Sequence, residues 1–178
     1  SAFLLNRSSD LRFIFSIDFH PQDISNKHNF THIFATSSAD WTTKIWAKNH
    51  NKEPLLTIDN SKNYVFCTQW NPKKASVLAT GDGDGYLDIF DINKSIEGPK
   101  ARFKVDGDNG TSTGINKIDW SEDGEKILVG DSGGKTYLLG LKKDLFSYGE
   151  ENNSDRFAKF IEKCQNDWKE KDKEKKTK

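Results

Sequence analysis

ATSSADWTTKIW (residues 35–46), ATGDGDGYLDIF (residues 79–90) and LVGDSGGKTYLL (residues 128–139) align with one another without a gap. Each of the three segments begins with an apolar run that favours a strand and continues through Ser, Gly and Asp residues that favour a tight turn. Each then ends in an alternation of apolar and polar residues, which is typical of a second strand. The sequence therefore predicts three strand–turn–strand units of one design.

A further apolar strand that ends in an aromatic residue precedes each unit: IFSIDFHP (residues 14–21), VFCTQWNP (residues 65–72) and INKIDWSEDG (residues 115–124). The segments at residues 54–60 and 101–107 can supply outer strands. The complete unit recurs at intervals of about 44 to 50 residues, which is the spacing of the four-stranded blades of a β-propeller. We therefore predict an all-β protein built from three such blades, and the strand pattern argues against a helical solenoid.

Particular residues in the units match the WD-repeat pattern of propellers. Asp40 and Asp84 occupy the same place in the first two turns, and Trp46 and Phe90 close the strands that follow. A turn aspartate accepts hydrogen bonds that fix the hairpin, and a terminal aromatic packs between neighbouring blades. We assign structural roles to these four residues. The third unit has Gly133 and Leu139 at the two places, so we expect its turn to be less firmly held.

The end of the chain has a different pattern. A polar linker leads into a predicted amphipathic helix that Ser154 can cap and that Asp155 stabilises against the helix dipole. Its apolar side chains recur at helical spacing and share one face: Phe157, Phe160, Ile161, Cys164 and Trp168. This face either packs on the propeller of the same protein, the commoner arrangement, or docks on a partner. Beyond Trp168 nearly every residue is charged, so we expect the last turns to be solvated.

The composition limits the kinds of partner. Lys plus Arg and Asp plus Glu each number 27, so the formal net charge is zero and no general field attracts nucleic acid or an anionic membrane. No apolar run is long enough to span a bilayer. Cys67 and Cys164 lie far apart without a CxxC pairing, which fits reduced thiols. These features favour protein partners, and Trp41, which follows a turn aspartate, is a candidate for an interface or for packing on the next blade.

Patterns for chemistry are incomplete. Asp82, Asp84 and Asp88 offer oxygen ligands, but Asn93 stands where a calcium loop needs a bidentate glutamate. The glycines of this segment lead into a strand, whereas a phosphate-binding loop leads into a helix. The histidines form no HExxH pattern, and no serine lies in a nucleophile elbow. We therefore expect no catalytic residue, metal, cofactor or small-molecule substrate.

The run from Phe30 to Pro72 resembles the dynein intermediate chains, whose blades carry a Thr-Ser-Ser-x-Asp-Trp-Thr-x-Lys-x-Trp motif, here Thr36 to Trp46. A Pro-Leu strand and a Tyr-Val pair follow in both. DGDGYLDIFDIN (residues 82–93) and VGDSGGKTYLL (residues 129–139) are similar to runs of the same family. Phe90 stands where the family usually has Trp. The likeness covers about residues 13 to 139.

The resemblance implies that the three blades are the last of seven in a non-catalytic motor subunit. Its propeller would dock on the tail of a dynein heavy chain, beside other intermediate or light chains, in cytoplasmic dynein or in the ciliary axoneme. The alternative is a WD-repeat adaptor in another complex. Three blades cannot close a ring, so we expect further blades to complete it. The expected divisions are a connection at 1–12, blades at about 13–58, 59–107 and 108–141, and a linker and helix at 142–178.

Overall fold

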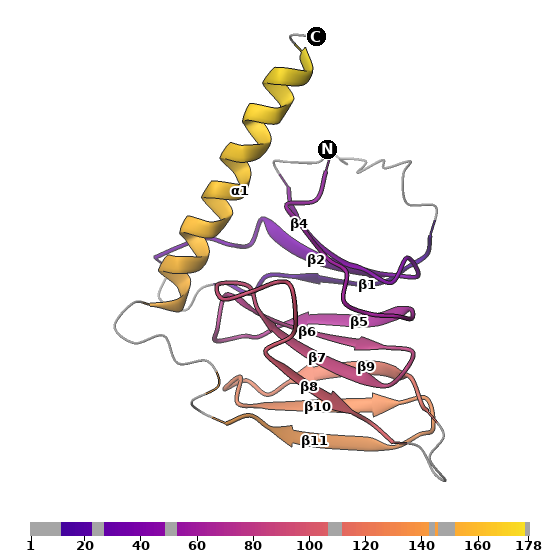
Figure 1. Ribbon diagram of the computed structural model, residues 1–178. Helices are drawn as coiled ribbons and strands as arrows, with labels where there is room; N and C mark the ends of the chain where they lie inside the picture. The colour runs from indigo at the N-terminus through magenta and orange to yellow at the C-terminus, as the bar shows by residue number, and fades with distance from the viewer. Residues whose placement is uncertain are drawn as a thin grey trace, which may run out of the picture.

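The computed structural model describes residues 12–22, 27–48, 53–106, 112–142, 145 and 152–176. These residues form eleven strands and one helix (Figure 1): β1 (Ile14–Phe19), β2 (Ile33–Ser38), β3 (Thr43–Ala47), β4 (Leu56–Ile58), β5 (Val65–Trp70), β6 (Val77–Asp82), β7 (Tyr86–Asp91), β8 (Ala101–Lys104), β9 (Ile115–Trp120), β10 (Lys126–Asp131), β11 (Thr136–Gly140) and α1 (Asn153–Lys176). The connection predicted at 1–12 lies outside the described residues, apart from Arg12. The prediction of a mainly β fold with a helix at the end is confirmed.

The strands form three antiparallel sheets, with orders β1-β2-β3-β4, β5-β6-β7-β8 and β9-β10-β11. Each sheet is a meander, because strands that are adjacent in the sequence pair with each other. β1 contacts β5, and β5 contacts β9. The three sheets therefore lie one after another in layers, with their first strands side by side (Figure 1).

The middle sheet lies between the other two, and its side chains alternate between its two faces. Leu78 and Phe90 belong to a buried cluster shared with the first sheet, which also contains Ile33, Ile45 and Ile58. Val77, Ala79, Leu87 and Ile89 belong to a second cluster shared with the third sheet, together with Ile115, Ile127 and Val129. Burial of these apolar surfaces, at about 25 cal/mol per Å², holds the three sheets together.

The outer faces of the first and third sheets carry exposed apolar side chains. Ser16 and Asp18 bond to β5, so Ile17 and Phe19, which alternate with them, point away from the second sheet and are 62% and 65% exposed. Leu128 and Leu138 on the third sheet are 44% and 66% exposed. Such apolar faces are typical of surfaces that pack against another element.

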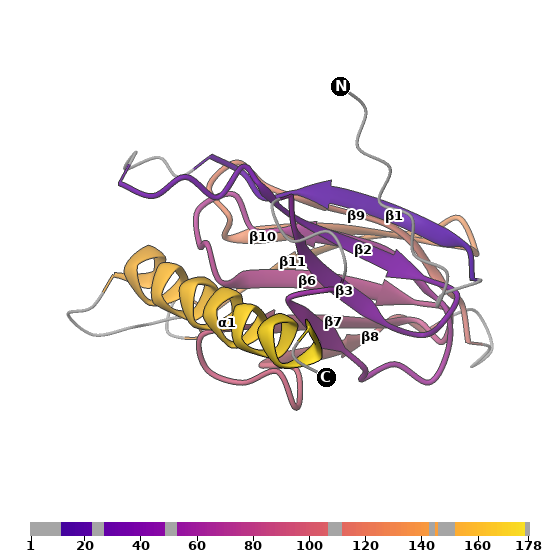
Figure 2. The same cartoon turned by 90° about the horizontal axis from the view of Figure 1, so that it is seen from above.

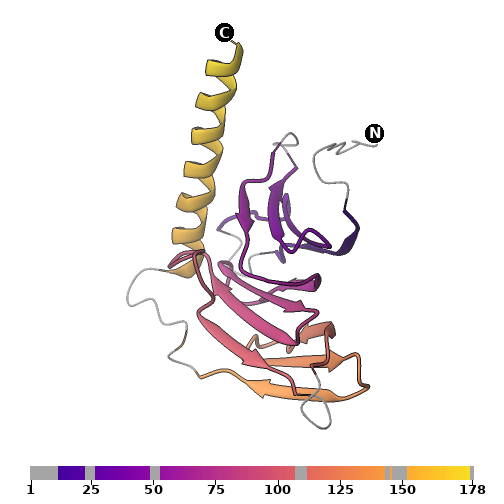
Figure 3. The same cartoon turned by 45° about the vertical axis from the view of Figure 1, so that its right-hand side comes forward.

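The first turns of α1 lie beside the ends of the first two sheets, and the rest of the helix projects past the first sheet (Figures 1 and 3). Seen from above, the helix runs along one side of the stacked sheets (Figure 2). No helix among the described residues has the length and apolar character needed to cross a membrane.

Candidate functional site

The three turns predicted from the repeats have one common geometry. The backbone N–H groups of Trp41, Gly85 and Gly134 donate to the carbonyls three residues before them. The φ angles of these residues are 72°, 84° and 85°. This left-handed conformation suits glycine and is strained for a residue with a Cβ. Trp41 is the one non-glycine residue with a positive φ in the described part of the chain.

Asp40 ties the first turn to the strand that follows it. Its carboxylate accepts the backbone N–H of Thr42 at 3.0 Å and the hydroxyl of Thr42 at 2.7 Å, and it pairs with the Lys44 ammonium. Burial raises the pKa of Asp40, but the hydrogen bonds from Lys44 and Thr42 outweigh it, so the pKa is lowered overall. The ionised carboxylate is therefore the form that holds this turn.

In the second turn, the aspartate that accepts the hydrogen bonds of the hairpin is Asp82, whereas Asp84 was predicted for this role. Asp82 accepts the N–H groups of Tyr86 at 2.8 Å and Asp84 at 3.0 Å, and the Ser61 hydroxyl at 2.8 Å. Burial raises the pKa of Asp82 despite these hydrogen bonds. Asp84 instead accepts a hydrogen bond from the Asn63 amide at 2.7 Å and joins the turn to the preceding loop.

The expectation of a loosely held third turn is wrong. Asp131, which aligns with Asp82, accepts the N–H of Lys135 at 2.7 Å, the Thr113 hydroxyl at 3.1 Å and the Tyr137 hydroxyl at 3.2 Å. Burial raises the pKa of Asp131, but these hydrogen bonds together lower it overall. Asp131 lies at the end of β10, and its hydrogen bonds hold the turn without a side chain at position 133. Asp82 and Asp131 occupy the same position in the aligned repeats. This match could have identified both turn aspartates from the sequence.

Replacing Asp131 with alanine is expected to lower the melting temperature by a few degrees, because three donors lose their acceptor. The difference from wild type should be full above the ordinary carboxyl pKa and should shrink as the pH falls through the lowered folded-state pKa, where Asp131 becomes protonated. Thermal unfolding followed by circular dichroism at several pH values measures it. Asp131→Asn keeps one acceptor and is the milder control; equal melting temperatures for Asp131→Ala and wild type would contradict the assignment.

The aromatic residues that close the repeats lie on corresponding faces of their sheets. Phe90 is buried between the second sheet and the first, and Leu139 of the third repeat packs toward the second sheet. Trp46 donates its indole N–H to Thr36 at 2.9 Å and stacks on Phe34. Phe34 in turn contacts Phe19. Trp46 therefore lies on the outer face of the first sheet.

Exposed aromatic side chains gather at the end of the sheets where the first turn lies. The backbone N–H of Ala39 in the turn donates to the carbonyl of Phe13, and the Phe15 ring lies 6.1 Å from that of Tyr64. The four residues of this aromatic rim are Phe13, Phe15, Trp41 and Tyr64, with exposed fractions of 81%, 42%, 49% and 42%. Trp41 also borders a crevice between the first two sheets with a volume of about 10 Å³, which is too small for an organic ligand.

The helix face predicted from the sequence divides into two parts. Phe157 is fully buried, with its ring 5.0 Å from Phe30 and 5.8 Å from Trp70, and Ile161 is buried beside it. Phe160 packs against the same cluster and is partly buried, and Trp168 is also partly exposed. The structure thus uses Phe157 and Ile161 for packing within the chain, which removes them from the candidate partner surface. The reason is the long-range fold, which brings loops of two sheets to the start of α1.

Polar contacts fix the start of α1 on both sheets. Asp155 pairs with Lys27 at 2.8 Å and His28 at 2.6 Å, and these two partners lower its pKa. Asn153 accepts the N–H of Ser76 at 3.1 Å through its side chain. The capping residue is Asn152, whose side chain accepts the N–H of Ser154 at 3.3 Å. The prediction that Ser154 caps the helix is therefore wrong by two residues.

The acidic loop has no geometry for a cation. Asp88 forms a two-pronged ion pair with Arg102, with both N···O distances at 2.6 Å, and Asp82 is taken up by the turn. Among the described residues no group of three or more His, Cys, Asp or Glu side chains could hold a metal ion.

The sequence of this chain is similar to those of known proteins. No protein-family model matches the sequence. The chain is 33% identical over 117 residues to cytoplasmic dynein 1 intermediate chain of Drosophila melanogaster, covering 66% of this chain and 17% of that protein. It is 30% identical over 118 residues to dynein intermediate chain 2, ciliary, of Heliocidaris crassispina, covering 66% and 16%. The chain thus spans about a sixth of the length of these relatives.

The fold is similar to the WD40 domain of Toxoplasma gondii coronin, with a TM-score of 0.59 and 21% identity over 72% of this chain and 31% of that chain. At this level of identity the likeness concerns the fold alone. The prediction of WD-repeat propeller blades is confirmed.

Proposed function

The chain is a homologue of a segment of the dynein intermediate chains, and from this premise we propose that it forms blades of a non-catalytic propeller that docks on the tail of a dynein heavy chain. Further proposed partners are other intermediate or light chains. The proposed location is the cytoskeleton, in cytoplasmic dynein or in the ciliary axoneme. In this role the protein works by shape, since the rigid sheets present turns and a rim of aromatic side chains to a partner.

Further blades of the same propeller are proposed to cover the two outer faces. Ile17 and Phe19 on one face and Leu128 and Leu138 on the other are exposed at positions that alternate with buried or bonded residues. A blade packed on each face would bury these side chains in the way that the middle sheet is buried. The segments 13–58, 59–107 and 108–141 are then the proposed blades, and 142–178 the linker and helix.

Trp41 is the residue that most supports a docking surface at the aromatic rim. The two turns equivalent to its own have glycine at this position, and a tryptophan in the left-handed region costs about 1 kcal/mol or more. Its side chain stays 49% exposed, so about half of the ring remains available to a partner. Strained residues and exposed tryptophans are both typical of binding surfaces. Trp41 is therefore proposed as the central anchor for the heavy chain, with Phe13, Phe15 and Tyr64 around it.

Trp41→Gly is expected to weaken binding to the heavy-chain tail about thirtyfold or more, the effect of losing an aromatic hot spot. The variant relieves the left-handed strain and loses the packing of a half-buried ring, so its stability should stay close to that of wild type. Binding of the full-length protein to a recombinant heavy-chain tail, measured by biolayer interferometry, tests this. Trp168→Ala, which removes another partly exposed tryptophan, is the matched control.

The two tryptophans separate the alternatives. Full affinity for Trp41→Gly together with a loss for Trp168→Ala would overturn the rim and assign docking to the helix. A full-length protein that binds no heavy chain, and recovers a different complex instead, would replace the motor subunit with a WD-repeat adaptor. Because fold does not determine function, this binding measurement is the experiment that decides the proposed function.

A further inference from the structure

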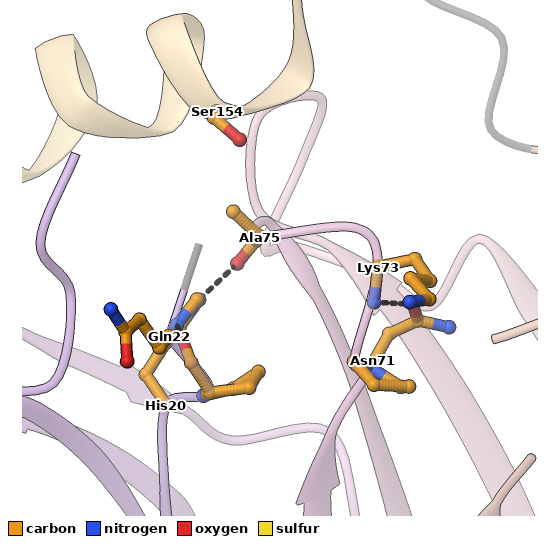
Figure 4. Close-up of a pocket in the computed structure, with 8 residues that line it drawn as sticks. His20, Gln22, Asn71, Lys73, Ala75 and Ser154 are labelled. Atoms are coloured by element: carbon orange, nitrogen blue, oxygen red, sulfur yellow. Dashed lines mark hydrogen bonds between the residues drawn. The ribbon is translucent and has the colours of Figure 1, made fainter. Parts of the chain in front are cut away.

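A buried histidine lies where the first two sheets meet the helix. His20 is 3% exposed. Its Nδ1 lies 2.8 Å from the carbonyl oxygen of Pro21, and its Nε2 lies 2.8 Å from the carbonyl oxygen of Ala75 in the loop between β5 and β6. Figure 4 shows the second of these bonds, with the start of α1 at Ser154 beyond it. The ring therefore joins the end of β1 to a loop of the second sheet.

The two partners of the ring are both acceptors. A backbone carbonyl oxygen only accepts hydrogen bonds, so a ring nitrogen that bonds to one must donate. A neutral imidazole has one N–H group and a lone pair on its other nitrogen, and that lone pair would face a carbonyl oxygen. Both contacts at 2.8 Å are hydrogen bonds at the same time only in the doubly protonated, positively charged imidazolium.

Aromatic rings surround the His20 ring. Phe157 of α1 stacks on the His20 ring at 5.4 Å with an interplanar angle of 18°, and Trp70 and Phe30 lie at 4.7 Å and 5.0 Å. The face of an aromatic ring attracts a cation, and more strongly when water is excluded. The contact with Phe157 therefore links the charge on His20 to the position of the helix.

Some charged groups on the neighbouring elements oppose a positive charge on His20, and others favour it. Lys73 lines the same small cavity as His20, and the positive end of the helix dipole lies at Ser154; both oppose the charge. Asp155 favours the charge but already pairs with Lys27 and His28. From β1, Asp18 accepts the backbone N–H of Trp70. The cavity has a volume of about 30 Å³, room for water rather than for an organic ligand.

We infer that His20 is a protonation-dependent clamp that fastens the C-terminal helix to the first two blades. While the ring is doubly protonated, it holds both carbonyls and attracts Phe157. When the ring becomes neutral at higher pH, one carbonyl loses its donor and the cation–π attraction disappears. The docking of α1 is therefore strongest at low pH and weakens as the pH rises. This inference is independent of which partner the propeller binds.

The experiment uses the full-length protein with ¹⁵N-labelled histidine. Ring ¹⁵N shifts of His20 report directly whether both nitrogens carry protons while the helix is docked. In parallel, hydrogen-exchange protection factors of the α1 amides at residues 157–161, corrected for the intrinsic pH dependence of exchange, are followed between about pH 5.5 and pH 8.5. We expect both nitrogens to be protonated at the lower pH, and protection to fall about tenfold or more across the range as the ring loses a bond to a charged donor.

Two variants assign this pH dependence, because His28 also contacts the helix. His20→Gln is expected to remove the fall in protection, and His28→Gln to retain it. An unprotonated nitrogen on His20 while the helix is docked would overturn the inference, and this readout needs no variant to fold. A fall that survives in His20→Gln, or that His28→Gln alone abolishes, would also overturn it.

Discussion

Phe157→Ala is expected to release α1 from the blades, with a loss of about 3 to 5 kcal/mol of docking free energy. The Phe157 side chain is fully buried and contacts the rings of His20, Phe30 and Trp70. Truncation to alanine would leave a cavity beneath these three rings. Hydrogen exchange of the α1 amides should therefore approach that of an undocked helix, and Trp70 fluorescence should change as its environment becomes wetter.

Phe160→Ala provides the comparison on the same helix. Phe160 packs at the margin of the cluster and is partly buried, so its loss should cost far less and leave α1 docked. The packing of the third sheet on the second should change little in either variant, since the cluster between these two sheets does not include the helix. If the α1 amides of Phe157→Ala stay as protected as those of wild type, the helix does not depend on this contact.

Gly85→Ala is expected to destabilise the blades by roughly 3 kcal/mol or more, through strain and a steric clash together. Gly85 has a φ of +84°, and an added Cβ would lie 2.4 Å from the carbonyl oxygen of Thr113 and 3.0 Å from Val105 Cγ2. The first of these neighbours is backbone between two sheets and cannot turn aside. Equilibrium unfolding by denaturant measures the loss.

Gly134→Ala is a matched control because the same turn position has the same conformation. Its φ is +85°, but an added Cβ would meet nothing within 4 Å. This variant should lose only the cost of the left-handed backbone, about 1 kcal/mol. Trp41→Gly, at the third equivalent position, removes this backbone cost instead of adding it. Equal losses for Gly85→Ala and Gly134→Ala would show that the contact with Thr113 is relaxed in solution.

The aromatic rim and the helix dock lie at opposite ends of the sheets. β1 lies between Phe13 at the rim and His20 at the dock, and its six residues separate the two sites by about 20 Å. The binding measurement on Trp41 and the pH measurement on His20 consequently test separate sites.

Much of the fold was predictable from local patterns. The three aligned segments became the hairpins β2–β3, β6–β7 and β10–β11, and the segments at 54–60 and 101–107 contain β4 and β8. The helical spacing from Phe157 to Trp168 lies within α1. These predictions succeeded because strand alternation, turn residues and helical periodicity depend on neighbours in the sequence.

The candidate sites were less predictable because they join distant segments. Asp82 and Asp131 hold the turns through partners on preceding loops, such as Ser61 and Thr113, and no local pattern gives these pairs. Trp41 was predicted as a surface candidate from its place after a turn aspartate. Its left-handed backbone conformation is given by the structure.

The sequence by itself determined that this protein consists of repeated β-hairpins followed by an amphipathic helix, because those elements arise from interactions within a few residues. Only the tertiary structure decided how they are used. His20, Ala75 and Phe157 come together from three separate elements, and their contact decides that one end of the apolar helix face is buried within the chain. Burial between distant segments also brings both ring nitrogens of His20 to within 2.8 Å of carbonyl oxygens, an arrangement that no local pattern in the sequence gives.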